Sequence, residues 1–264
     1  MATPVPSLPR RFRATASHYL AGRPPYPPRL IERVAALTGL PRDGRVLDLG
    51  CGPGQLAQAF APLAAEVLAV DPEPEMLRVA RQAAGGARIR FLQASSHDLG
   101  PAFGRFHLVV MGRSFHWMDR AETLRRLDPL IEPGGAVVLF GDTLPELPDN
   151  AWRMPWREAV TRFRNLDIGR PHHGPGWVRH EAVLLDSAFS RLDSVAAIDR
   201  RRIPAATLVE RALSRSSTAQ LRHGERSAAL SEAVLRALEP FTVDGMITEV
   251  VEAYALIATR PGAA

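Results

Sequence analysis

The sequence predicts an α/β fold, a doubly wound and mostly parallel sheet with helices on both faces. Short apolar runs typical of buried strands alternate with amphipathic stretches of helical length between residues 28 and 140. The chain has 264 residues, of which 46% are hydrophobic and 23% charged, as in ordinary globular proteins. A chain of this length can bury one sizeable core, so we expect a single domain over residues 1–264.

The first expected element is a helix that follows the proline-rich turn 19–27. Pro28 suits the first turn of this helix, and Gly39 with Pro41 marks its end. The other expected elements are, in chain order, strand 45–49, helix 55–63, strand 66–70, helix 72–84, strand 88–93, strand 106–111, helix 118–130, strand 136–140, strand 192–203, helices 205–213 and 225–238, and strand 246–259.

The alternation of strands and helices stops after residue 141. Residues 142–190 contain three of the four tryptophans of the chain. The segment is too long for a plain crossover between strands. We therefore expect it to add helices that cover the functional site.

A glycine-rich turn follows the first expected strand. Gly50, Gly52 and Gly54 come directly after this strand, and glycine lets the backbone adopt positive φ and approach a ligand closely. The second strand ends in Asp71, 21 residues after Gly50. An acidic side chain at this distance can accept hydrogen bonds from the two hydroxyls of a ribose. The two signals together predict a site for a nucleoside cofactor.

The spacing of the glycines separates the possible cofactors. A dinucleotide site needs G-x-G-x-x-G, and Gln55 stands where the third glycine would be, which disfavours a nicotinamide dehydrogenase. The G-x-G-x-G spacing led by Asp48 resembles the first motif of the class I S-adenosylmethionine-dependent methyltransferases. The resemblance covers roughly residues 19–261 and favours the small-molecule branch, which is similar to trans-aconitate and ubiquinone methyltransferases. It implies a Rossmann-like, seven-stranded sheet of order 3-2-1-4-5-7-6 with an antiparallel last strand.

The resemblance also implies how the chain is divided. We expect an N-terminal tail and lid, a cofactor-binding core, a helical cap insertion, and C-terminal strands and helices. These parts are placed at residues 1–44, 45–141, 142–190 and 191–264, respectively.

The resemblance implies a role for each part of the cofactor site. Asp48 supports the turn, and Asp71 holds the ribose, although an Asp at a strand–helix junction also suits a helix N-cap. Ser95 stands where relatives often carry an acidic residue, so Ser96 or Asp98 is the alternative partner of the adenine. The residues expected at S-adenosylmethionine, or its product S-adenosylhomocysteine, are Tyr19, Arg23, Asp48, Gly50, Cys51, Gly52, Gly54, Gln55, Asp71, Pro72, Met76, Ser95, Ser96, His97, Met111, Gly112, Arg113 and Trp117.

The acceptor side is marked by aromatic residues and histidines. His116, in a His-Trp dipeptide that relatives share, is the candidate general base, with a structural role as the alternative. For Cys51 we favour packing over nucleophilic chemistry, and His172 with His173 lacks the spacing of a zinc site, so no metal is expected. The candidate acceptor-binding residues are Tyr26, His116, Trp152, Trp156, His172, His173 and Trp177, although Trp152 and Trp156 suit a buried core equally well.

Composition narrows the possible partners and the compartment. The net charge is +5, but all 33 basic residues are arginines dispersed along the chain, which favours a solvated surface over a nucleic-acid patch. One cysteine suits a reducing cytoplasm. No apolar run predicts a secretory signal or a membrane span, and the oligomeric state does not follow from the sequence.

The sequence therefore predicts methyl transfer to an O, N or C nucleophile of a small molecule, such as a natural product. One alternative is a protein that binds S-adenosylmethionine without transferring methyl, as a cyclase or a binding module. Another is an RNA or protein methyltransferase, although the chain has neither the Asn/Asp-Pro-Pro-Tyr/Phe motif nor paired catalytic cysteines.

Overall fold

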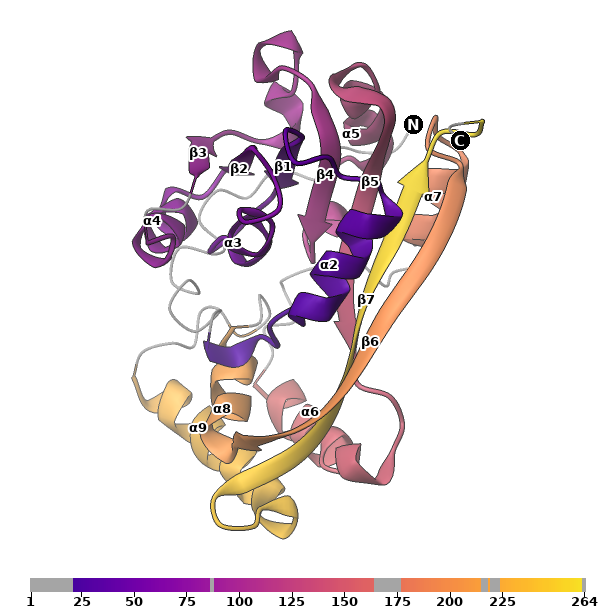
Figure 1. Cartoon of the computed structure of the whole chain (residues 1–264). Coiled ribbons are helices and arrows are strands. Elements are labelled where there is room, and N and C mark those ends of the chain that lie inside the picture. Colours follow the sequence, from indigo (N-terminus) through magenta and orange to yellow (C-terminus); the bar gives the residue numbers. More distant parts are fainter. Residues whose placement is uncertain (1–20, 86–87, 164–176, 215–217, 219–223, 263–264) are drawn as a thin grey trace.

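The computed structural model describes residues 21–85, 88–163, 177–214, 218 and 224–262 (Figure 1). Its seven strands form one sheet of order β3-β2-β1-β4-β5-β7-β6, which confirms the predicted order. Strands β1 to β5 are parallel to one another, and β7 runs antiparallel to both β5 and β6. The strands are β1 Arg45–Leu49, β2 Glu66–Asp71, β3 Ile89–Gln93, β4 Phe106–Gly112, β5 Ile131–Thr143, β6 Arg191–Pro204 and β7 Met246–Thr259.

Helices connect these strands close to the predicted positions. The α-helices in the described residues are α2 Pro28–Leu37, α3 Gln55–Phe60, α4 Pro74–Ala83, α5 Arg120–Leu127, α6 Arg153–Thr161, α7 His180–Leu185, α8 Ala205–Leu213 and α9 Glu225–Leu238. Short 3-10 turns include η1 Ser96–Asp98, η3 Phe115–Trp117, η4 Asp128–Leu130 and η5 Pro148–Asn150. Helix α5 is shorter than predicted because Asp119 caps its start, accepting from the Glu122 N–H, and the η4 turn follows its end.

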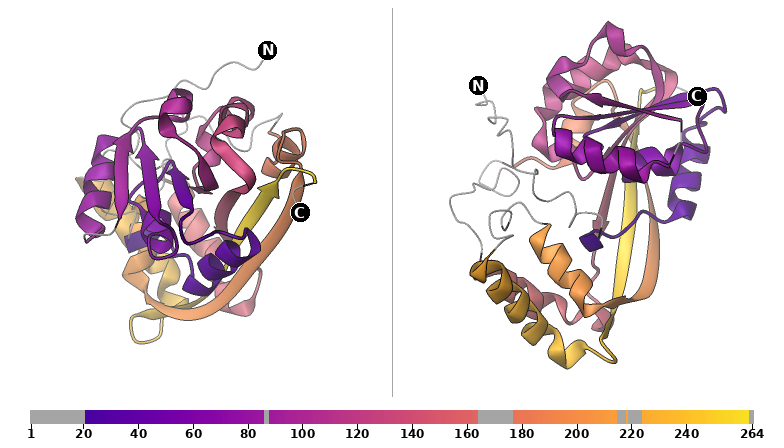
Figure 2. Two further views of the ribbon diagram at one scale, coloured as in Figure 1. Left: turned by 45° about the horizontal axis from the view of Figure 1, so that its top comes forward. Right: turned by 90° about the vertical axis from the view of Figure 1, so that its left-hand side faces the viewer.

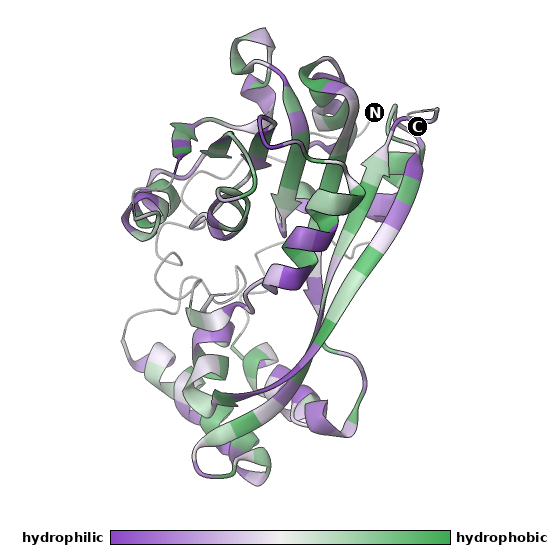
Figure 3. Ribbon diagram, in the orientation of Figure 1, coloured by the Kyte–Doolittle hydropathy of each residue, from purple (hydrophilic) through white to green (hydrophobic). Residues whose placement is uncertain are grey.

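Alternating side chains of the strands build a core on each face of the sheet. In β4, Leu108 and Val110 pack on the face that α2, α3 and α4 cover, while Val109 and Met111 pack on the face of α5 and α7. Most of the sheet consists of hydrophobic residues, whereas the helices have both polar and apolar sides (Figure 3). This two-sided burial is what a doubly wound sheet requires.

A third core lies at the far end of the long strands. Strands β5, β6 and β7 have 13, 14 and 14 residues, against 5 to 7 in β1 to β4, and they extend beyond the rest of the sheet (Figures 1 and 2). There α6, α8 and α9 pack on Ile203 and Ile247, and we call these three helices the cap. The cap therefore comes from two stretches of chain: α6 lies within residues 142–190, where added helices were predicted, and α8 and α9 lie between β6 and β7. Helix α7, inside that range, packs instead with α5 and β6.

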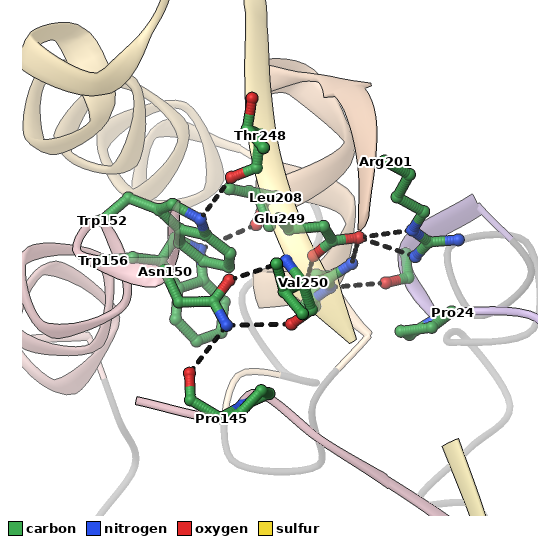
Figure 4. Close-up of polar contacts among 12 residues, drawn as sticks. Pro24, Pro145, Asn150, Trp152, Trp156, Arg201, Leu208, Thr248, Glu249 and Val250 are labelled. Carbon is green, nitrogen blue, oxygen red and sulfur yellow. Dashed lines mark hydrogen bonds and ion pairs between the residues drawn. The ribbon is translucent and has the colours of Figure 1, made fainter. Parts of the chain in front are cut away.

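Buried polar contacts attach the cap, and the η5 turn that precedes α6, to β7. The Asn150 side chain donates to the carbonyls of Pro145 and Val250 at 2.8 and 2.9 Å and accepts from the Val250 N–H at 3.0 Å (Figure 4). Glu249, with no exposed surface, accepts from Arg211 of α8 at 2.7 Å and from Arg201 of β6 at 2.6 Å. These contacts satisfy polar groups that would be costly to bury without a partner.

Candidate functional site

The glycine turn lies at the carboxyl ends of the central strands. Gly50, Gly52 and Gly54 all have positive φ, of 71°, 52° and 82°, and the Gly50 N–H donates to the Val70 carbonyl at 2.8 Å. A Cβ on Gly50 would lie 2.6 Å from the Ser114 Cβ, so only glycine fits there. A Cβ on Gly52 would meet no atom within 4 Å. The turn is therefore tight against Ser114, which follows β4, and open at Gly52, where a ligand has room.

Asp48 comes shortly before this turn and contacts the helix that follows it. Its side chain is 1% exposed, and one carboxylate oxygen accepts from the Ala57 N–H of α3 at 2.8 Å. Burial raises the pKa of Asp48 to about 7, although the hydrogen bond from Ala57 acts in the opposite direction. Asp48 is thus bound to the helix that follows the turn, and its role in supporting a cofactor-binding turn stays a prediction.

Asp71 joins the end of β2 to the glycine turn. One oxygen accepts from the Gly52 N–H at 2.8 Å and the other from the Glu73 N–H at 2.9 Å. Because a carboxylate oxygen has a second lone pair, each can still accept from a ribose hydroxyl. Helix α4 begins at Pro74 with Glu73 at its N-cap position, so Asp71 is not the N-cap residue. Burial raises the pKa of Asp71 to about 6, against the two backbone hydrogen bonds.

A small pocket opens beside the turn. It joins the glycine turn, the start of α3 and the end of β4, and so brings together residues predicted at the cofactor with Tyr26, which was predicted at the acceptor. The pocket is lined by Tyr26, Asp48, Gly50, Cys51, Gly52, Pro53, Gln55, Leu56, Gly112 and Arg113. Burial raises the pKa of the Cys51 thiol well above its usual range, as expected for a packing residue.

Arg113 fixes one wall of this pocket. It has a positive φ of 55° and forms an ion pair with Asp142 at the end of β5. The same guanidinium donates to the Pro24 carbonyl at 2.8 Å and to Gln55 at 3.3 Å, and lies 4.5 Å from the centre of the Tyr26 ring. The segment after residue 21 is thereby held against the start of α3.

Asp142 was missed by the sequence analysis. Burial alone would raise its pKa, but Arg113 and Arg23 bring that pKa below its usual value, so the carboxylate is ionised. The partner is separated from Arg113 by 29 residues, and no local pattern relates them.

The predicted adenine side is arranged around η1. The Asp98 carboxylate accepts from the N–H and the hydroxyl of Ser95, both at 2.7 Å, which closes a capping box. Ser96 is buried, His97 is exposed, Met76 is 3% exposed and Pro72 lies at the surface. Asp98 is thus engaged locally with Ser95, the residue for which it was the predicted alternative.

A second group of predicted residues meets beyond the end of β4. His116 and Trp117 are in η3, with ring centres 5.1 Å apart, and His116 stacks with His180 at 6.4 Å. Trp177 also contacts His180, at 5.6 Å. The structure therefore brings His116 and Trp177 together around His180, which sequence analysis did not single out.

The other predicted acceptor residues lie elsewhere. Trp152 and Trp156 are 1% and 5% exposed in the cap core, and their indole N–H groups donate to the carbonyls of Thr248 and Leu208, both at 3.0 Å (Figure 4). Their contacts are those of core residues, the alternative that the sequence had left open. His172 and His173, and also Tyr19, which was predicted at the cofactor, lie outside the described residues.

Comparisons with known proteins find similar methyltransferases. A family model described as a methyltransferase domain matches residues 46–135. The malonyl-[acyl-carrier protein] O-methyltransferase of Enterobacter lignolyticus is 30% identical over 75% of this chain and 74% of its own length. A ubiquinone biosynthesis O-methyltransferase of Xanthomonas axonopodis is 37% identical over 58% of this chain and 67% of its own length.

Other comparisons show the fold or cover less of the relative. An S-adenosylmethionine-dependent methyltransferase from Thiobacillus denitrificans, solved with S-adenosyl-L-homocysteine, matches with a TM-score of 0.52 at 15% identity, over 96% of this chain and 99% of that chain. This chain spans about half the length, 53%, of the first curated relatives that it matches, which are mycobacterial methyltransferases. No helix among the described residues has the length and apolar composition needed to cross a membrane.

Proposed function

Because the chain belongs to the class I S-adenosylmethionine-dependent methyltransferases, we propose that it transfers a methyl group from S-adenosylmethionine to a small molecule. The observation that carries this proposal is the pocket beside the glycine turn, with Asp71 anchored next to it. The open space at Gly52 supports it further, because a ligand can approach the backbone there.

The residues of the pocket suit the parts of such a cofactor. The methionine part would lie over the glycine turn between Gly52 and Gly112, and the ribose hydroxyls would donate to Asp71. When bound, S-adenosylmethionine supplies an electrophilic methyl group, so the protein needs mainly to align the acceptor. His116, at the end of β4, is our candidate to take a proton from an acceptor that must lose one.

The class of the acceptor is part of the proposal. The relatives named malonyl-[acyl-carrier protein] O-methyltransferase and ubiquinone biosynthesis O-methyltransferase support an oxygen nucleophile on a small acceptor group. The partly exposed aromatic side chains beside His116 support a binding surface for it.

Calorimetry tests the cofactor. S-adenosylmethionine should bind and NAD should not, and Asp71→Ala should weaken S-adenosylmethionine binding at least about 100-fold, because two charge-assisted hydrogen bonds are lost. Glu232→Gln, on the exposed side of α9, is the matched control and should leave the affinity unchanged. Equal affinity in Asp71→Ala and the unmodified protein would refute the site.

Turnover tests the transfer. Incubation with S-adenosylmethionine and metabolite extracts should release S-adenosylhomocysteine and give a product heavier by one methylene. Binding without turnover in any extract would favour the binding module over the enzyme. Turnover only with added RNA or protein would show that the chain is an RNA or protein methyltransferase instead.

A further inference from the structure

Five aromatic side chains from two distant segments gather beyond the carboxyl end of β4. We call Phe115, His116, Trp117, Trp177 and His180 the aromatic cluster. His180 is at its centre, with ring centres 5.2 Å from Phe115, 6.4 Å from His116 and 5.6 Å from Trp177. Phe115 is the buried member of the cluster, whereas the other four are partly exposed. The cluster therefore presents aromatic surface outward.

This cluster adjoins the cofactor turn. Ser114 and Met118 flank η3 on either side, and both lie against Gly50, since a Cβ there would be 2.6 Å from the Ser114 Cβ and 3.1 Å from the Met118 Cε. The Ser114 hydroxyl also donates to the Leu49 carbonyl at 2.9 Å. The turn that carries His116 is thus fixed to the end of β1, at the edge where ligands of open α/β sheets bind.

Arg120 sets the hydrogen-bonding state of His180. One Arg120 nitrogen lies 3.2 Å from Nδ1 of His180 and donates to the Val178 carbonyl at 2.7 Å, and its guanidinium stacks 4.0 Å from the centre of the Trp177 ring. A guanidinium can only donate, so Nδ1 must accept and the ring proton is on Nε2. Burial and Arg120 lower the pKa of His180, against the opposing effect of Glu181. His180 is therefore a neutral ring whose proton is on Nε2.

We propose that the aromatic cluster is the acceptor site and that His180 determines specificity by donating a hydrogen bond through Nε2 to an oxygen of a planar, conjugated acceptor. Aromatic walls favour flat π-systems, and a neutral donor suits a carbonyl or phenolic oxygen. Such an acceptor would lie beside His116, the candidate base. This inference rests on the proposed methyl transfer and adds the class of its acceptor.

The first test uses protein saturated with S-adenosylhomocysteine. Catechol and 3,4-dihydroxybenzoate should bind and change the tryptophan fluorescence, whereas cyclohexane-1,2-diol, which has the same hydroxyls on a non-aromatic ring, should bind at least about tenfold more weakly. Equal binding of catechol and the saturated diol, or no binding of either phenol, would overturn the proposal.

Two variants separate the hydrogen bond from the packing of the ring. His180→Phe keeps an aromatic ring without a donor and should weaken phenol binding about five- to tenfold. His180→Gln keeps a donor near the Nε2 position and should stay within about threefold of the unmodified protein. Arg236→Gln, at the surface of α9, is the control. If His180→Phe bound the phenols as tightly as the unmodified protein, His180 would not determine specificity.

Nitrogen NMR tests the state of the ring directly. In the unmodified protein, His180 should show a protonated Nε2 and an unprotonated Nδ1, and in Arg120→Gln it should become protonated at a higher pH than before. A protonated Nδ1 would contradict the assignment. Calorimetry with S-adenosylmethionine is measured on each variant, because lost cofactor binding would refute the proposed function, whereas intact cofactor binding with indifferent phenol binding would refute only this inference.

Discussion

The glycine turn and the cap use different means to stay ordered. At the turn, backbone carries the structure, since Gly50 and Gly52 adopt positive φ and Asp48 and Asp71 accept from main-chain N–H groups. In the cap, large side chains carry it, and Trp152 is buried with its indole N–H bound to a β7 carbonyl. The order of the glycine turn therefore depends on which residue stands at each position. The order of the cap depends instead on the total volume of its buried side chains.

The largest effect should come from opening the cap core. Trp152→Ala removes a side chain that is 1% exposed, and we expect the free energy of unfolding to fall by about 3–5 kcal/mol. Chemical unfolding measures this loss. At a temperature where the variant stays folded, the affinity for S-adenosylmethionine should stay within about twofold. A selective loss of affinity without loss of stability would place Trp152 in the site and break the comparison.

The next effect should come from the glycine turn, and it depends on local space. Gly50→Ala adds a Cβ only 2.6 Å from the Ser114 Cβ at a φ of 71°, and should cost about 2–4 kcal/mol of stability. Gly39→Ala is the matched control, since its φ is 60° but the added Cβ would meet nothing within 4 Å, and it should cost about 1 kcal/mol. Similar losses in both variants would show that φ alone, and not close contact, selects glycine at position 50.

The pH dependence of nucleoside binding should be a smaller effect. Burial raises the pKa of Asp71 to about 6, and ribose hydroxyls bind its ionised form, so binding at pH 5 must first remove a proton. Affinity should therefore rise with pH through about 6, and be about tenfold weaker at pH 5 than at pH 8. Adenosine is the suitable probe, because it lacks the titrating amino acid part of the cofactor. A flat profile would mean that Asp71 does not hold the ribose.

The smallest effect should come from the surface of the cap. Arg236 and Glu232 form an exposed ion pair one helical turn apart on α9, and Arg236→Gln should change stability by less than about 0.5 kcal/mol. Thermal unfolding at low and high salt measures this contribution. A larger loss would show that surface charge, as well as buried volume, holds the cap.

Sequence reasoning succeeded where a local pattern determines the outcome. The glycine turn and Asp71 at the end of β2 follow from residues within one β–α–β unit, and the order of the strands was implied by the family resemblance that this unit carries. It failed where distant segments meet. His180 lies 64 residues after His116, and Asp142 is 29 residues from Arg113, so neither partner could be identified before the chain was folded. For Trp152 the residue type fits a pocket wall and a core equally, and only its buried position and carbonyl partner decide.

The buried carboxylate of Glu249 has a consequence for how β6 and β7 find their alignment. Side chains of a strand alternate between faces, so a shift of β7 by one residue would carry Glu249 away from Arg201 and Arg211. A buried charge left without its partners costs about 3–5 kcal/mol. The misaligned strand pair would also separate Val250 from Asn150. The buried ion pairs thus favour one register of the two longest strands, and this register fixes the position of the cap relative to the sheet.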